Sequence, residues 1–278
     1  MSTLNEEIVE EIQKRAPSLQ DIPEIRMVAI SLGYTFVELS NDTMGVCFTS
    51  RSESGSCSHY PRAGTLSSTP ILELTELMLS SNPLEKSVGV AAVNAMSQTI
   101  MLNEPEKYRY MKSDFLNILP FHGRKLTVGM VGNIGPFIPF LLKQASSLIV
   151  VDDNSALKTG FQKSGYTISR DIGDLSNVEI LIITGSSAAV GDFDQVIETA
   201  KSAAFIGVVG PSAGWLPDPA FRRGVHAVGA TEIVDIPKAR RAILEGGGTP
   251  HFMDYGRKYT VLHPAYLPYP DGSAFLIS

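Results

Sequence analysis

Four short runs of polar or small residues, three of them with glycine, each follow a buried, strand-like segment of the chain. They are Gly132-Asn133-Ile134-Gly135, Asp152-Asp153-Asn154, Thr184-Gly185-Ser186-Ser187 and Gly210-Pro211-Ser212-Ala213-Gly214. Glycine lets a backbone approach a ligand closely, and serine and threonine hydroxyls add hydrogen-bond donors. We therefore predict that these runs bind a small molecule.

The first run is typical of the opening of a nucleotide-binding half-fold. It lies between two apolar segments, and Asp152 follows Gly132 by twenty positions, where such folds hold a ribose diol. The run does not meet the Gly-x-Gly-x-x-Gly spacing, which counts against NAD more than against an adenosyl group. An enzyme that uses S-adenosylmethionine or a nucleotide cofactor therefore stays open as an alternative.

The predicted site residues differ in role. The turn after the first strand would offer backbone donors, Asp152 would accept from hydroxyl groups or a cation, and the Thr and Ser hydroxyls would fix the orientation of the ligand. Asn94 is the one strongly polar residue of the small, apolar segment 88–96, and a buried asparagine must find partners. The full set is Gly132, Asn133, Gly135, Asp152, Thr184, Gly185, Ser186, Gly210, Pro211, Ser212 and Asn94.

Catalytic residues cannot be assigned, because the sequence identifies no acid–base pair. Whether the chain is an enzyme therefore stays open, and a non-catalytic carrier or sensor of a small molecule is a further alternative. The sequence has no P-loop motif, which disfavours a P-loop nucleotide hydrolase.

Soft metal ligands occur together only at Cys57-Ser58-His59, with Cys47 nearby. Thiolate and imidazole groups suit zinc, copper or nickel, but this spacing matches no closed zinc site. A free loop cysteine and a surface histidine are the favoured interpretation. Asp152 and Asp153 could also bind a metal ion, although such pairs more often cap the next helix.

The elements that position these residues fall into two regions. In residues 1–110 we predict a helix from the capping box Thr3-x-x-Glu6 to Arg15, then three strands and two helices. The predicted strands are 26–32, 34–39 and 44–49, and the helices are 71–79 and 84–101. A further helix near 108–116 would lead into the second region.

In residues 111–278 strands and helices alternate, and the strands lack a period of two. That pattern is typical of parallel strands covered on both faces, so we predict an α/β fold with a doubly wound parallel sheet. The predicted strands are 126–131, 148–151, 179–183, 205–209, 225–228 and 258–262. The predicted helices are 136–145, 155–163, 192–202, 217–223 and 237–244.

Composition excludes several classes of partner. The 278 residues carry a net charge of −6 and no cluster of lysine and arginine, which disfavours nucleic acid. The longest apolar runs are near six residues, so we expect no membrane partner. Two cysteines make no disulfide framework, which favours the cytoplasm. A homodimer is the common default for such a chain.

Nearly the whole chain resembles the putative heavy-metal chelation family of largely uncharacterised prokaryotic proteins. The resemblance is carried by Gly89–Ala95, Val128–Pro136, Ile182–Ser187 and Val209–Ala213, the last continuing through Leu216-Pro217 and Phe221 to Gly224. It implies an enolase N-terminal-like domain followed by a Rossmann-like domain, and we expect a small anionic or metal-chelating molecule to bind in the cleft between them. It also implies a transition-metal ion or metal chelate as the bound group. Because no dense Cys/His set accompanies these motifs, the metal is expected to arrive on a small organic chelator.

Overall fold

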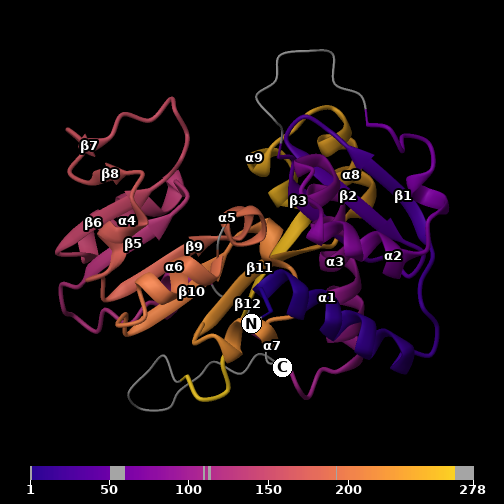
Figure 1. Cartoon of the computed structure of the whole chain (residues 1–278), viewed down its shortest axis with the longest axis horizontal. Coiled ribbons are helices and arrows are strands. Elements are labelled where there is room, and N and C mark those ends of the chain that lie inside the picture. The colour runs from indigo at the N-terminus through magenta and orange to yellow at the C-terminus, as the bar shows by residue number, and fades with distance from the viewer. Residues whose placement is uncertain (1, 51–59, 109, 112–113, 192, 267–278) are drawn as a thin grey trace.

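The computed structural model describes residues 2–50, 60–108, 110–111, 114–191 and 193–266 (Figure 1). It contains a three-stranded antiparallel sheet of β1 (Ile25–Ile30), β2 (Tyr34–Leu39) and β3 (Met44–Phe48). A second sheet has nine strands in the order β4-β12-β11-β10-β9-β5-β6-β8-β7. The small sheet and the large sheet lie side by side, with α1 (Leu4–Arg15) beside both (Figure 1).

Helix α3 (Pro83–Asn103) covers one face of the small sheet and is buried from Ser87 to Met101. Small residues let the helix lie very close to β3, since a Cβ on Gly45 would be 2.1 Å from the carbonyl oxygen of Ala91. Helix α2 (Ile71–Glu76) and α1 complete this layer, and α1 begins with the predicted capping box between Thr3 and Glu6.

The large sheet has six consecutive parallel strands at its centre. They are β5 (Thr127–Val131), β6 (Ser147–Val151), β8 (Thr167–Ser169), β9 (Ile180–Thr184), β10 (Phe205–Val209) and β11 (Ala227–Ile233). Numbered along the chain, their spatial order is 3-2-1-4-5-6, which is the strand order of dinucleotide-binding folds. Antiparallel strands β12 (Gly256–Leu262), β4 (Tyr110–Met111) and β7 (Gly160–Phe161) lie at the margins. The predicted α/β fold class is confirmed.

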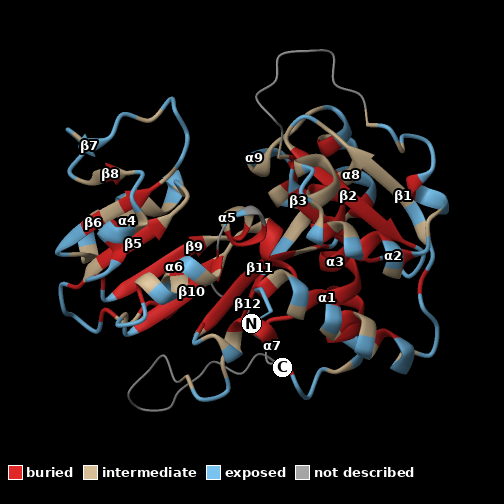
Figure 2. Ribbon diagram, viewed as in Figure 1, coloured by how far each residue is buried: buried red, intermediate tan, exposed pale blue. Residues whose placement is uncertain are grey.

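Alternate residues of the central strands belong to opposite cores, and β9 and β10 are buried over all but their last residue (Figure 2). In β9, Leu181 and Ile183 pack with α5 (Gly185–Val190), α6 (Phe193–Thr199) and α7 (Asp218–Arg222). Ile180 and Ile182 pack on the other side, with α4 (Ile138–Gln144). This two-sided burial explains why the strand sequences lack a polar period.

The second face of the small sheet is covered by α8 (Ile236–Leu244) and α9 (Thr249–Phe252). Phe252 lies edge-on against Tyr34, with ring centroids 4.7 Å apart. The small sheet is therefore enclosed between α3 and two helices that come from the C-terminal part of the chain. The division into domains 1–110 and 111–278 stays a prediction.

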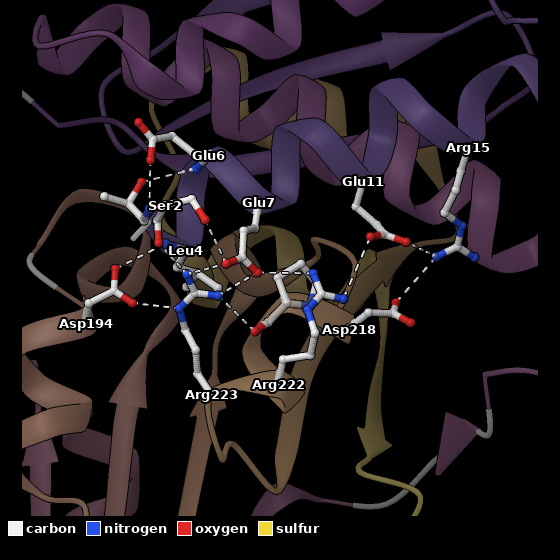
Figure 3. A network of polar contacts seen from close by, with 12 residues as sticks. Ser2, Leu4, Glu6, Glu7, Glu11, Arg15, Asp194, Asp218, Arg222 and Arg223 are labelled. Carbon is white, nitrogen blue, oxygen red and sulfur yellow. Dashed lines mark hydrogen bonds and ion pairs between the residues drawn. The ribbon is translucent and has the colours of Figure 1, made fainter.

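Helix α1 is attached to α6 and α7 by a network of ion pairs, which Figure 3 shows from close by. Arg223 contacts Glu7 at 2.8 Å and Asp194 at 2.6 Å. At the other end of α1, Arg15 pairs with Glu104 and, at 3.4 Å, with Asp218. These contacts join the first helix of the chain to the helices beside the large sheet.

Two predicted helices are wrong. Residues 155–163 form turns followed by β7, because Gly160 has a φ of +97°, which a helix cannot contain. In 108–116, Tyr110 and Met111 pair with β12, and the Asp114 side chain caps a 3-10 turn from Phe115 to Ile118. The other predicted strands and helices are confirmed within a few residues at their ends, except that the strand predicted at 225–228 begins and ends later, as β11 at 227–233. The elements β4, β7, β8, α5 and α9 were not predicted. Of the helices in the described ranges, none combines the length and apolar character of a membrane span.

Candidate functional site

The strand order reverses between β5 and β9, which are neighbours in the sheet although β6 and β8 lie between them in the chain. In open parallel sheets, ligands bind outside the carboxyl ends of the strands at this switch point. Gly132 follows β5 and Thr184 ends β9, so two of the four predicted runs meet there.

Gly132 contacts the third run directly. It has a φ of +80°, and a Cβ at this position would lie 2.5 Å from Thr184 Oγ1 and 2.9 Å from Ser187 Oγ. Only glycine fits both the backbone conformation and the space. The turn after β5 is therefore packed against the hydroxyl groups at the start of α5.

Three hydroxyl groups are connected at the start of α5. Thr184 Oγ1 donates to Ser187 Oγ at 2.7 Å, accepts from the Ser187 amide at 3.2 Å and lies 3.2 Å from Ser186 Oγ. Ser187 was not among the predicted site residues. Its place directly after Ser186 in the same run was the signal that could have identified it.

The third and fourth runs also touch. A Cβ on Gly185 would lie 2.6 Å from the Ala213 amide nitrogen, and one on Gly210 would lie 3.5 Å from the amide nitrogen of Gly185. Gly210 has a φ of +139°, which favours glycine, and Pro211 opens the 3-10 turn Pro211–Ala213. These glycines allow the carboxyl ends of β9 and β10 to lie in contact.

Ser212 and Asn94 join the large sheet to the small one. Ser212 is 2% exposed, and its hydroxyl accepts from the Phe48 amide at 3.0 Å. The Asn94 side chain donates to the carbonyl oxygens of Val46 at 2.8 Å and Ser212 at 3.1 Å. Both side chains therefore form a buried cross-link between β3, α3 and the end of β10, and neither is presented on the surface.

Cys47 lies beside this cross-link and is buried. Burial raises the pKa of its thiol to about 12. The neutral thiol is neither a nucleophile nor a ready metal ligand at neutral pH. Cys57 and His59, the other candidate soft ligands, lie outside the described residues.

Asp152 is partly exposed, and its carboxylate is bound by backbone groups. Oδ2 accepts from the Asn133 amide at 2.7 Å, and Oδ1 accepts from the Asn154 amide at 2.8 Å. Asn133 and Gly135 are exposed, and a Cβ on Gly135 would meet no heavy atom within 4 Å. This end of the site is open to solvent.

The structure thus brings the four predicted runs together in a single strand-end row, which we define by its members. At the exposed end are Asp152, Asn133 and Gly135; in the middle are Gly132, Thr184, Ser186, Ser187, Gly185, Gly210 and Pro211; at the buried end are Ser212 and Asn94. The amides of Gly132 and Asn133, predicted as donors to a ligand, donate instead to the Val151 carbonyl oxygen and the Asp152 carboxylate.

The described residues do not fit a metal ion bound by protein side chains alone. Within the described ranges, no group of three or more His, Cys, Asp or Glu residues is placed to hold one. The Asp152 carboxylate, the acid of the strand-end row, already accepts from two backbone amides. We therefore assign no chemical step to a metal held directly by these side chains.

The chain is similar to several proteins without an assigned function. An uncharacterized protein of Methanocaldococcus jannaschii, MJ0500, is 25% identical over 263 residues, which cover 91% of this chain and 97% of that protein. Crystal structures of DUF364-family proteins from Pyrococcus horikoshii and Desulfitobacterium hafniense are 23% and 16% identical. Each has a TM-score of 0.73 and matches 92% of this chain and 99% of its own, which supports the fold described above.

Two family models match consecutive parts of the chain. One covers residues 12–97, which include the small sheet and most of α3, and the other covers residues 116–262, which include the strand-end row apart from Asn94. Both carry the description "Putative heavy-metal chelation". The second model spans more than half of the sequence, and the chain therefore belongs to the DUF364 family, described as "Putative heavy-metal chelation".

Proposed function

We propose that the protein binds a small anionic or metal-chelating molecule at the strand-end row, beside the small sheet. The observation that carries the proposal is the contact of Gly132 with Thr184 and Ser187 at the switch point of the sheet. This is the place where open α/β sheets bind ligands, and here it is lined by backbone amides and hydroxyls.

A metal would reach this site on an organic chelator. Hydroxyl and backbone N–H groups are donors for the carboxylate or phosphate oxygens of a chelator, whereas transition metals prefer imidazole and thiolate ligands. The family description refers to heavy-metal chelation. In our proposal, the strand-end row binds the organic chelator that carries the metal and does not bind the ion directly. In this proposal the ion itself makes no bond to the described side chains.

A nucleotide or adenosyl group is the second candidate ligand, because the strand order 3-2-1-4-5-6 is that of dinucleotide-binding folds. The same row would then hold phosphate or carboxylate oxygens of the cofactor. The two candidates differ in whether binding requires a metal ion.

Thermal unfolding with a panel of probes separates these candidates. The panel contains S-adenosylmethionine, NAD, and zinc, nickel, cobalt and iron salts, each salt with and without citrate. A ligand at a hundredfold excess over its Kd stabilises the folded state by about 2.7 kcal/mol. We expect a metal with citrate to raise the midpoint more than either component does alone. Stabilisation by nucleotide probes only would contradict the chelate proposal.

The Gly132→Ala variant tests the place of binding, and Gly160→Ala is its matched control. Both glycines have positive φ, +80° and +97°, so both variants carry the same kind of backbone strain. A Cβ on Gly160 meets nothing within 4 Å, whereas one on Gly132 enters the strand-end row. We expect the first variant to lose the stabilisation by the active probe and the second to keep it. Equal responses in the two variants would place the ligand elsewhere.

A further inference from the structure

Asp152 makes hydrogen bonds that its position in the sequence does not suggest. A carboxylate at the end of the second parallel strand is expected to accept hydrogen bonds from the hydroxyl groups of a ribose. In this structure its two carboxylate oxygens instead accept hydrogen bonds from the backbone amides of Asn133 and Asn154, at 2.7 and 2.8 Å. Hydrogen bonds to an ionised acceptor are about twice as strong as neutral ones.

These bonds place Asp152 at the junction of three strand ends. Its own amide donates to the carbonyl oxygen of Ser169 at the end of β8, at 3.1 Å. The Gly132 amide donates to the carbonyl oxygen of Val151, directly before Asp152, at 2.8 Å. The bond to Asn133 then fixes the next peptide of the same turn.

We infer that Asp152 is a positioning residue, which acts on the bound ligand by holding the turn Gly132–Gly135 in its binding conformation. This inference rests on the proposed ligand site, because it assigns to that turn the contact with the ligand. Ile134 anchors the far side of the turn by packing against the core, whereas Gly135 is exposed and a Cβ there would meet no heavy atom within 4 Å. Without the carboxylate, the turn would lose the bond that orders Asn133.

Amide hydrogen exchange of the free, full-length protein tests this role, with Asp152→Ala compared with Asp153→Ala. Asp153 is the adjacent exposed acid and is the matched control. We expect the amides of Asn133 and Asn154 to exchange at least tenfold faster in Asp152→Ala and at the wild-type rate in Asp153→Ala. The Gly132 amide, which bonds to Val151, should keep its protection in both and so report that β5 and β6 remain paired.

The Asp152→Asn variant adds a second readout. Its side chain has one acceptor oxygen, so we expect it to protect one of the two amides and not both. The inference would be overturned if the Asn133 amide of Asp152→Ala exchanged at a rate within twofold of the wild-type rate. It would also be overturned if the Asn133 amide were unprotected from exchange in the wild-type protein.

Binding measurements then separate this inference from the proposed function. If Asp152 acts through the turn, its replacement weakens the binding of every probe that stabilises the wild-type protein, whether the probe has a ribose, as S-adenosylmethionine does, or has none, as nickel citrate does. If the variant lost binding only of the ribose-containing probe, Asp152 would contact the ligand directly, and the inference would be overturned. If no probe binds to the wild-type protein, the proposed function fails, and the exchange experiment still decides whether Asp152 holds the turn.

Discussion

Glu38 of β2 is fully buried, and Arg240 of α8 binds both of its carboxylate oxygens, with distances of 2.8 Å from Nε to Oε2 and 2.7 Å from Nη2 to Oε1. Arg26 adds a third contact at 3.2 Å. A buried carboxylate requires such partners, because an unpaired buried charge is costly. The pair links the small sheet to a helix that lies about two hundred positions later in the chain.

Replacing Arg240 by methionine should lower the free energy of unfolding by about 2–4 kcal/mol, since Glu38 would keep only Arg26. Because methionine preserves most of the apolar part of the arginine side chain, the lost stability measures the contribution of the guanidinium charge. Urea denaturation at pH 7 measures the change. Arg241→Met, an exposed position on the same helix, is the control and should change stability by less than about 0.5 kcal/mol. Equal effects of the two variants would mean that the buried pair contributes nothing.

Glu7 should make the protein sensitive to acid. The hydrogen bond from Arg223 lowers the pKa of the Glu7 carboxyl to about 2, from an ordinary value of 4.5. A lowered pKa in the folded state stabilises the protein above pH 4.5, and this contribution disappears as the pH falls toward 2. Because Glu7 is partly exposed, we expect Glu7→Gln to cost about 1 kcal/mol at pH 7 and almost nothing near pH 2.

The measurement is the free energy of unfolding of wild type and Glu7→Gln between pH 2 and 7. Glu10→Gln, an exposed residue of the same helix, is the control for the substitution itself and should change the free energy of unfolding at pH 7 by less than about 0.5 kcal/mol. A difference between wild type and Glu7→Gln that stays constant over this range would rule out the ion pair as its cause.

Cys47 should be inert in the folded protein. Burial raises the pKa of the Cys47 thiol to about 12, so the thiol is neutral at pH 8, and the side chain is enclosed by the protein. We expect iodoacetamide to modify Cys47 at least a hundredfold more slowly in the native protein than in urea. A Cys57→Ser background isolates the reaction of Cys47. Native and unfolded rates within tenfold of each other would contradict the burial of Cys47 beside Ser212.

The sequence predicted the fold well where its patterns are strong. Parallel strands such as β9 and β10 were identified because both faces are buried, and α1 and α3 were identified from their N-terminal caps. The helix proposed for 155–163 failed because two turn glycines, Gly160 and Gly165, outweigh the helix-forming residues before them. Short elements such as β8 depend on pairing with β6, which no local pattern reveals.

The candidate site was predicted as a set of residues but not in its roles. The carboxyl ends of parallel strands meet by topology, so the four runs could be grouped from the sequence. The sequence does not reveal which of these polar groups are already hydrogen-bonded within the protein and therefore cannot bind a ligand. The side chains of Ser212 and Asn94 serve the contact with the small sheet, and that contact joins segments more than a hundred positions apart. Hydrogen bonds over such separations appear only when the chain is folded.

The most direct test of the central claim is amide hydrogen exchange with and without the probe that raises the unfolding midpoint most. We predict slower exchange at residues 132–135 and 184–187, which meet at the switch point between β5 and β9, and unchanged exchange at residues 160–161 of β7. A probe that stabilises the protein while leaving 132–135 and 184–187 unchanged would contradict the assignment of the strand-end row as the binding site.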